Sequence, residues 1–192
     1  IIVVISFFRY GASDKGVTKD TMLESYYAYF TTTVPLLDYW IDYTNTTGFK
    51  SYGMAAMSGF VTIIFMILHR FGFQYPTLLK QTNEYIALTQ NFIQTFSGHK
   101  YNAFVSLFYY FYVDFRWAGV VIGSLIFGIM TARIERKVSL YSTDYLIAKY
   151  MLYSFAIVKS FTRLEFYNTT YLVSFLMLLL CFKKDIVDRG EE

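Results

Sequence analysis

The residues best able to do chemistry in this chain are a carboxylate and an arginine two positions apart, Asp114 and Arg116. They stand between an aromatic-rich run, 102–113, and a glycine-containing apolar run, 117–132. A carboxylate can take up a proton and an arginine can hold an anion, so the two are the first candidates for a functional site. The alternative is structural: both charges cap a helix start and pair with each other.

These two charges also predict how the surrounding stretch is built. In one continuous helix they would lie deep among apolar neighbours, where a charge is costly unless it is paired or faces a wet cavity. We therefore expect a break at 114–116, with 102–113 at the surface of a membrane and 117–132 crossing it. Trp117 and the tyrosines before the break would lie at the level of the lipid headgroups, where such rings are enriched.

The composition indicates a membrane protein. Hydrophobic residues make up 55% of the chain and charged residues only 16%, against about a quarter charged in soluble domains. The net charge of +3 is too small and too scattered to indicate nucleic-acid binding. The single cysteine, Cys181, provides neither a disulfide framework nor a thiolate metal site, and the acids do not cluster. We predict an all-α integral membrane protein, a polytopic helical bundle with a large extracytoplasmic loop, without metal or cofactor.

Apolar runs and polar intervals divide the chain into spans and loops. Two basic clusters, 133–137 and 183–184, lie two apolar runs apart, and short basic loops mark the cytoplasmic side of a membrane. The C-terminus is therefore predicted to be cytoplasmic. In order, the predicted segments are the end of a transmembrane helix (1–8), an extracytoplasmic loop with short or interfacial helices (9–101), an aromatic surface segment plus a transmembrane helix (102–132), a cytoplasmic loop (133–139), a transmembrane helix (140–158), an extracytoplasmic loop (159–170), a transmembrane helix (171–182) and a cytoplasmic tail (183–192).

Two apolar runs are shorter than a membrane span. A spanning helix needs about 20 apolar residues, and both 1–8 and 54–68 fall below that length. We interpret 1–8 as the end of a span. For 54–68, the length favours an interfacial, buried or re-entrant helix over a helix that crosses the membrane.

The layout and one motif resemble a known family. The motif follows a large extracytoplasmic loop and consists of an asparagine, an aromatic run, an Asp-Phe pair and spaced glycines. Its residues here are Asn102, Phe104, Tyr109, Tyr110, Asp114, Phe115, Gly119, Gly123 and Gly128. This pattern resembles the C-terminal part of the Wzy-type polymerases, which join O-antigen or capsular oligosaccharide repeat units in bacteria. A weaker resemblance is the tyrosine-rich stretch 26–30 ahead of a Leu-Asp pair at 37–38, and Arg116 departs from the pattern because the family usually has glycine there.

The resemblance implies an enzyme, a multi-pass glycosyltransferase of the bacterial inner membrane. Its substrate would be an oligosaccharide linked to a polyprenyl diphosphate, and its other expected partners are membrane lipid and a chain-length regulator. Such an enzyme must neutralise the charge that develops on the leaving diphosphate, orient two lipid-linked substrates and accept a proton from the attacking hydroxyl.

The resemblance also implies roles for individual residues. Arginines suit the diphosphate, because the guanidinium binds phosphate oxygens with paired hydrogen bonds and stays charged. Aromatic rings suit the sugars. The implied base candidates are Asp114, Asp38 and His99, and the implied substrate-binding residues are Arg9, Arg116, Arg163, Asn102, Tyr109, Tyr110, Tyr112 and Trp117.

Each of these candidates has a structural alternative. Arg9 would serve as an anchor whose side chain reaches the membrane interface. His99 lies in a polar turn where it would be solvated. Asp38 would cap a surface helix.

Three other functions fit parts of the pattern. A flippase or transporter for lipid-linked oligosaccharides would also bury charges among aromatic spans, although transporters usually show repeated halves. An O-antigen ligase would use the same donor with a different acceptor. A non-catalytic scaffold would need neither the aromatic run nor the charges at 114 and 116.

Overall fold

The computed structural model describes residues 31–94, 100–101, 105–141 and 143–181, and this part of the chain is helical apart from one two-residue β pairing. The predicted all-α class is confirmed for it. The predicted span end at 1–8 and the tail at 183–192 lie outside the described residues. In chain order, the elements are α3 (Thr33–Thr47), α4 (Met54–Leu68), η1 (His69–Phe71), α5 (Thr77–Ala87), η2 (Leu88–Gln90), β1 (Ile93–Gln94), β2 (Lys100–Tyr101), α6 (Ser106–Tyr141), α7 (Asp144–Lys159), η3 (Glu165–Tyr167) and α8 (Thr169–Cys181).

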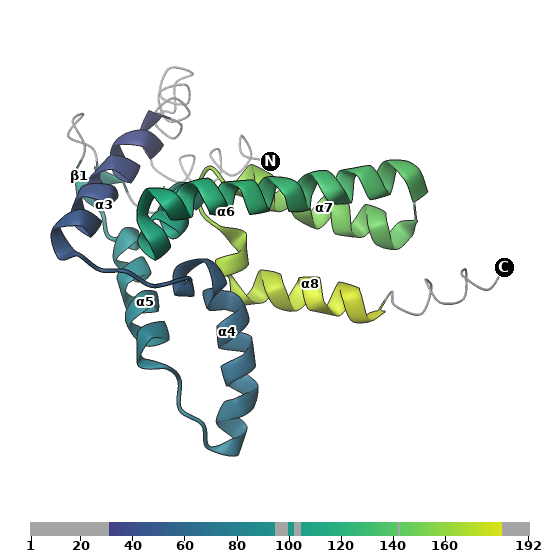
Figure 1. The fold of residues 1–192 in the computed structure, drawn as a ribbon, viewed down its shortest axis with the longest axis horizontal. Helices are drawn as coiled ribbons and strands as arrows, with labels where there is room; N and C mark the ends of the chain where they lie inside the picture. Colours follow the sequence, from purple (N-terminus) through teal and green to yellow (C-terminus); the bar gives the residue numbers. More distant parts are fainter. Residues whose placement is uncertain (1–30, 95–99, 102–104, 142, 182–192) are drawn as a thin grey trace, which may run out of the picture.

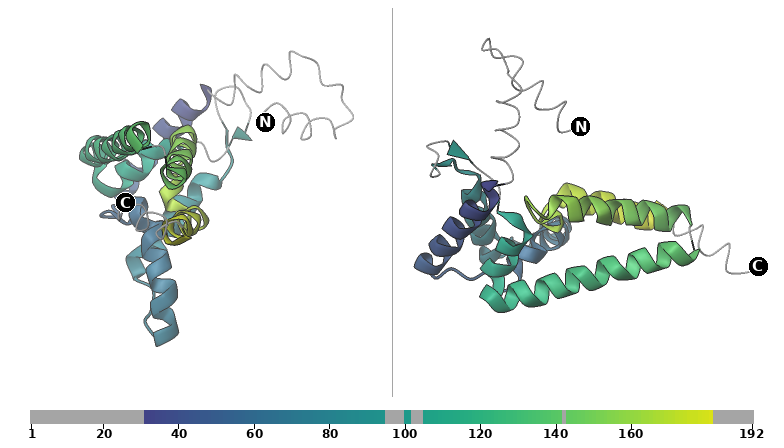
Figure 2. Two further views of the ribbon diagram at one scale, coloured as in Figure 1. Left: turned by 90° about the vertical axis from the view of Figure 1, so that its right-hand side faces the viewer. Right: turned by 90° about the horizontal axis from the view of Figure 1, so that it is seen from above.

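The helices form two regions (Figure 1). The head consists of α3, α4, α5 and the first part of α6, residues 106–114. The arm consists of the rest of α6, from residue 117, together with α7 and α8. In the arm, α7 runs back along α6, and α8 packs against α7. Helix α4 projects across the direction of the arm, as the left view in Figure 2 also shows.

The head has a core of aromatic and aliphatic side chains. Tyr109 is completely buried and lies against Trp40 of α3, with 6.4 Å between the ring centres. Phe49 and Tyr85 stack at 4.4 Å beside it. Ring contacts of this kind stabilise a core beyond the burial of area alone. The buried members of this core are Trp40, Ala55, Tyr85, Ile86, Val105, Leu107, Tyr109, Tyr110, Phe111, Val113 and Leu164.

The arm is apolar outside as well as inside. Val121, Leu125 and Ile126 on α6 are more than half exposed, as are Met151 and Val158 on α7. In the described part, two helical segments are long and apolar enough to cross a membrane, Met54–Phe71 and Ser106–Tyr141, and α8 contains a shorter apolar helix, Thr169–Leu178. Exposed apolar surface of this extent is typical of a face that lipid or another protein covers.

The end of α6 corrects one predicted boundary. The predicted cytoplasmic loop 133–139 is helical, because α6 continues to Tyr141 and α7 begins at Asp144. The charged residues in this stretch indicated a loop, but no glycine or proline occurs between 129 and 143 to end the helix. Before α7, Thr143 adopts an extended backbone, and Asp144 lies in the first turn of the helix. The apolar run 54–68, in contrast, coincides with α4.

Candidate functional site

The predicted break at 114–116 is confirmed as a feature of the backbone. Within α6, Phe115 has φ −137° and ψ 24°, and Arg116 has φ 58° and ψ −144°. After the break the helix folds back on its own first part. A Cβ atom at Gly119 would overlap the carbonyl oxygen of Phe111, and one at Gly123 would come within 2.5 Å of the Phe111 ring. These two glycines therefore permit the close return of the helix.

Asp114 caps another helix. Its Oδ1 accepts hydrogen bonds from the Ser51 hydroxyl at 2.5 Å and from the backbone N–H groups of Gly53 and Ala55, each at 2.9 Å. Its Oδ2 accepts a bond from the N–H of Ala56, also at 2.9 Å. The backbone N–H groups at the start of α4 have no partner within the helix, and Gly53 has no side chain to cap them. The carboxylate supplies this cap, and its charge also interacts favourably with the positive end of the α4 dipole.

The burial of Asp114 makes the cap structurally important. The residue is only 2% exposed. A buried carboxylate is costly unless hydrogen bonds satisfy its oxygens, and four donors do so here. Both oxygens are thus committed to holding α4. The role of Asp114 as a general base stays a prediction, and in this arrangement the carboxylate has no oxygen without a bond for an incoming hydroxyl.

Arg116 does not pair with Asp114. Its Nη2 donates to the carbonyl oxygen of Thr44 at 3.1 Å, in the last turn of α3, where cations interact favourably with the helix dipole. Its guanidinium also lies over the ring of Tyr112, 5.4 Å from the ring centre. The expectation that the two charges pair with each other is therefore wrong, whereas the expectation of a helix cap holds for Asp114. Each charge of the break instead secures the end of a different head helix.

The conformation of Arg116 is strained. A φ of 58° with a ψ of −144° is a backbone conformation that glycine adopts readily and other residues rarely do. In addition, Nη1 of Arg116 is buried without a hydrogen-bond partner. Strain and unpaired donors of this kind concentrate at functional sites.

The aromatic candidates divide into buried and exposed rings. Tyr109, Tyr110 and Tyr112 are at most 4% exposed, so a sugar ring could not stack on them in this arrangement. The Tyr112 hydroxyl donates to Oδ1 of Asn45 at 2.7 Å. Trp117, by contrast, is 64% exposed, and its ring contacts Tyr112 edge-on at 5.3 Å. Trp117 is therefore the predicted sugar platform whose ring remains accessible beside the break.

The other base candidates are not joined to this cluster. Asp38 is exposed on α3, and among the described residues it forms no ion pair with another candidate. His99, Arg9 and Asn102 lie outside the described residues. The break thus brings together Asp114, Arg116, Tyr112 and Trp117 of the predicted set.

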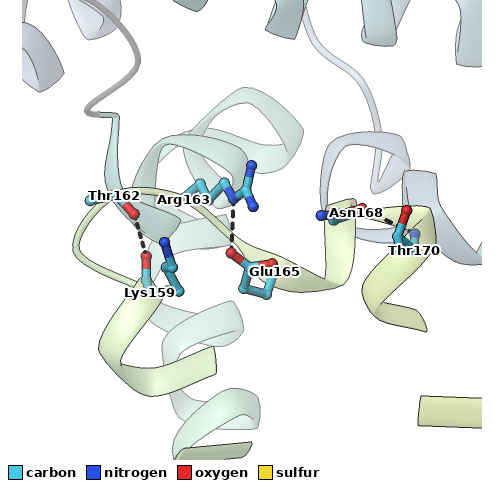
Figure 3. A network of polar contacts seen from close by, with 6 residues as sticks. All are labelled: Lys159, Thr162, Arg163, Glu165, Asn168 and Thr170. Carbon is cyan, nitrogen blue, oxygen red and sulfur yellow. Dashed lines mark hydrogen bonds and ion pairs between the residues drawn. The ribbon is translucent and has the colours of Figure 1, made fainter. Parts of the chain in front are cut away.

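Arg163 lies in a second polar cluster, in the loop between α7 and α8 (Figure 3). Its Nε donates to Oε1 of Glu165 at 2.8 Å, and this is the only ion pair within the described ranges. The Glu165 side chain is 1% exposed, whereas that of Arg163 is 48% exposed. Glu165 was not among the predicted residues. Its position between the apolar residues Leu164 and Phe166 was the signal that could have indicated a buried acid.

The loop is packed against the head. Phe166 and Tyr167 present carbonyl oxygens to Gly59 of α4, where a Cβ atom would come within 2.5 and 3.0 Å of them. Tyr167 also lies against Tyr110, with 5.3 Å between the ring centres, and burial raises the pKa of the Tyr167 hydroxyl. The second cluster is therefore fixed at the junction between head and arm.

Comparison with models of protein families, with curated proteins and with solved structures gives no match for this chain.

Proposed function

We propose that this chain is the C-terminal part of a membrane glycosyltransferase that polymerises oligosaccharide repeat units linked to polyprenyl diphosphate, at the outer face of the bacterial inner membrane. The observation that carries the proposal is the break in α6. Asp114 ties the break to α4, and Gly119 and Gly123 let the helix fold back on Phe111. Three of the residues on which the resemblance rests, Asp114, Gly119 and Gly123, therefore shape this one turn of the chain.

The exposed apolar surface supports a membrane setting for the arm. Residues 117–141 of α6 have a length of about 37 Å at 1.5 Å per residue, more than the ~30 Å of a hydrocarbon core. The basic residues Arg133, Arg136 and Lys137 lie near the end of α6 that is remote from the head. Basic residues favour the cytoplasmic side. The proposal therefore places the arm across the membrane and the head at the outer face.

Helix α4 would then lie along the membrane rather than cross it. It projects across the direction of the arm, and Ile64, Met66 and Ile67 near its end are more than half exposed. An apolar helix in this orientation is suited to the interface, where it would rest its exposed side chains in the outer leaflet. This agrees with the interfacial alternative that its length favours.

The proposed reaction joins two lipid-linked glycans. A hydroxyl oxygen of the acceptor sugar forms a bond to the anomeric carbon of the donor sugar, while the bond from that carbon to the diphosphate oxygen breaks. The diphosphate leaves with the electron pair, and the hydroxyl proton passes to a base. Trp117 offers an exposed ring to a sugar beside the break, and Asp114 holds the head that frames the site. Asp38 and His99 remain the candidate bases.

The test is reconstitution of the full-length protein in liposomes with a polyprenyl-diphosphate-linked repeat unit. We expect a ladder of longer glycans and release of polyprenyl diphosphate, both reduced about tenfold by Trp117→Ala because the loss of one aromatic sugar platform removes roughly 1–2 kcal/mol. Trp117→Phe should retain most of the activity. Phe71→Ala, which removes another exposed ring, should have no effect.

Three outcomes would contradict the proposal. Transbilayer movement of the lipid-linked unit without a longer product would identify a flippase. Transfer only to a lipid A core acceptor would identify a ligase. Equal loss of the product with Phe71→Ala and Trp117→Ala would show that the active site is not at the α6 break.

A further inference from the structure

Glu165 is an acid buried in a loop that the proposed reaction does not use. It lies in η3, which is wedged between Gly59 of α4 and the ring of Tyr110 on α6. A buried carboxylate is strongly disfavoured unless a cation or several hydrogen bonds compensate its charge. Here Oε1 accepts the Nε–H of Arg163 at 2.8 Å. The fold therefore maintains a costly charge in order to hold one arginine.

The bond that Glu165 makes leaves most of the guanidinium available. An arginine has five N–H donors in a rigid plane, and the described bond uses only the one on Nε. The side chain of Arg163 is 48% exposed, so its remaining donors are available to a ligand, while the hydrogen bond to the buried Glu165 orients the guanidinium. A guanidinium held in this way loses little conformational freedom when it binds an anion.

Lys159 adds a second cation to the same loop. The backbone N–H of Arg163 donates to the carbonyl oxygen of Lys159 at 2.9 Å, so the two residues belong to one tight turn. Figure 3 shows both side chains with Glu165 in this turn. The Lys159 ammonium lies over the ring of Phe155, 5.8 Å from its centre. Among the described residues, Glu165 is the one acid that pairs with Arg163, and no acid forms an ion pair with Lys159, so the two cations carry a net positive charge.

The surroundings of the two cations are apolar. Val158 is 70% exposed and Phe161 is 67% exposed, and they flank Lys159 and precede Arg163 in the chain. A binding site for a soluble anion would normally be surrounded by polar groups, whereas a lipid has a phosphate directly attached to hydrocarbon. Exposed apolar side chains next to an oriented arginine and a lysine therefore fit a lipid headgroup better than a free phosphate.

We infer that Arg163, oriented by Glu165 and assisted by Lys159, binds the phosphoryl group of a lipid headgroup. Glu165 is then a positioning residue that acts through Arg163. The inference deepens the proposed function and rests on it for the nature of the lipid, a polyprenyl diphosphate. It assigns the leaving diphosphate to the loop between α7 and α8, on the side of the head that η3 contacts.

The test measures binding of a polyprenyl diphosphate to the full-length protein in detergent micelles, by native mass spectrometry. Arg163→Ala should raise the Kd about tenfold or more, as expected for the loss of charge-assisted hydrogen bonds, and Arg163→Lys should raise it less. Glu165→Gln should raise the Kd severalfold, because a neutral amide oxygen holds the Nε–H of Arg163 less firmly than a carboxylate does. Arg136→Ala, which removes an exposed cation at the other end of the arm, is the matched control and should leave the Kd unchanged.

A double mutant separates positioning from a general effect on the fold. If Glu165 acts only through Arg163, Arg163→Ala with Glu165→Gln should bind as weakly as Arg163→Ala alone. This double mutant also avoids leaving a buried unpaired carboxylate, so it remains informative if Arg163→Ala alone does not fold. Additive losses from the two single changes would show that Glu165 is merely structural.

Competition identifies the source of the phosphate. Excess polyprenyl monophosphate should displace the bound polyprenyl diphosphate, whereas inorganic pyrophosphate at the same concentration should not. Equal displacement by pyrophosphate would overturn the lipid assignment, and an unchanged Kd in the folded double mutant would overturn the site. Because binding is measured without turnover, failure of the site is distinguishable from failure of the polymerase proposal, which the liposome reaction tests.

Discussion

The head and the arm differ in how far their side chains are buried and hydrogen-bonded. In the head, Asp114 and Arg116 make hydrogen bonds of 2.5–3.1 Å, and the side chains of Trp40, Tyr109 and Tyr110 are almost completely buried. In the arm, apolar side chains such as Leu125 and Met151 are 61% and 67% exposed. The head therefore resembles the interior of a water-soluble domain, while the arm has no interior of comparable size.

This difference indicates which interactions stabilise each of the two regions. The head is held by specific long-range bonds, so single polar changes there should be costly. The helices of the arm are stabilised mainly by their own backbone hydrogen bonds. Substitutions of the exposed side chains on the outer faces of the arm should therefore have little effect on folding. Four substitutions test this contrast, from the most to the least damaging.

The largest effect is expected for Asp114→Asn. The amide would turn an NH₂ group toward one of the donors at the start of α4, so at least one buried bond is lost and the negative charge that stabilises the helix end is removed. We expect a loss of about 2–4 kcal/mol in the free energy of unfolding. Thermal unfolding in detergent, followed by circular dichroism, measures it. Adding Arg116→Gly should not restore stability, because the two side chains do not pair.

Asp38→Asn is the matched control for this change. Asp38 is an exposed carboxylate on α3, and its loss should alter the unfolding free energy by about 0.5 kcal/mol or less. If Asp114→Asn left stability unchanged but stopped glycan polymerisation, the carboxylate would be catalytic and the cap dispensable.

A smaller effect is expected where the arm folds back on the head. Gly119→Ala would place a methyl group against the Phe111 carbonyl oxygen and should cost about 1–3 kcal/mol. Gly128→Ala, in the same helix, meets nothing within 4 Å and should be neutral or stabilising by up to about 1 kcal/mol. Comparison of the two melting temperatures checks the close return directly. Equal effects would mean that the two parts of α6 do not pack in this way.

The third prediction concerns the strained residue of the break. Arg116→Gly removes the bond to Thr44 but relieves the unfavourable backbone conformation, whereas Arg116→Ala removes the bond and keeps the strain. We therefore expect the glycine variant to be more stable than the alanine variant by about 1–2 kcal/mol. Denaturant unfolding of the two variants measures the difference. An alanine variant as stable as the glycine variant would show that the backbone at position 116 is not strained.

The smallest effect on folding is expected in the arm. Ile126→Cys, in a background with Cys181→Ser, should leave stability within about 1 kcal/mol because Ile126 is 53% exposed. In intact membranes this cysteine should resist a membrane-impermeant maleimide, while Thr46→Cys on the exposed surface of α3 should react. Labelling of both cysteines at the same rate would show that water, not lipid, covers the arm.

The sequence by itself determined the local features of this protein. Charges inside an apolar run located the break at 114–116, and the apolar run 54–68 has the same bounds as α4. Both signals act over short distances along the chain, because they depend on a continuous apolar run and on the cost of an unpaired charge within one. The composition was sufficient for the helical class. The helical continuation to Tyr141 was missed because charge alone does not end a helix.

Only the tertiary structure decided which groups form hydrogen bonds with Asp114 and Arg116. Asp114 bonds to residues 58–63 positions away, and Arg116 to a carbonyl oxygen 72 positions away. The two are neighbours in sequence, so a mutual pair was the simplest expectation, yet the break directs one toward α4 and the other toward α3. Likewise, the burial of Glu165 depends on α4, α7 and α8 meeting around η3. Such pairings arise from how distant segments pack, and no short-range pattern in the chain encodes them.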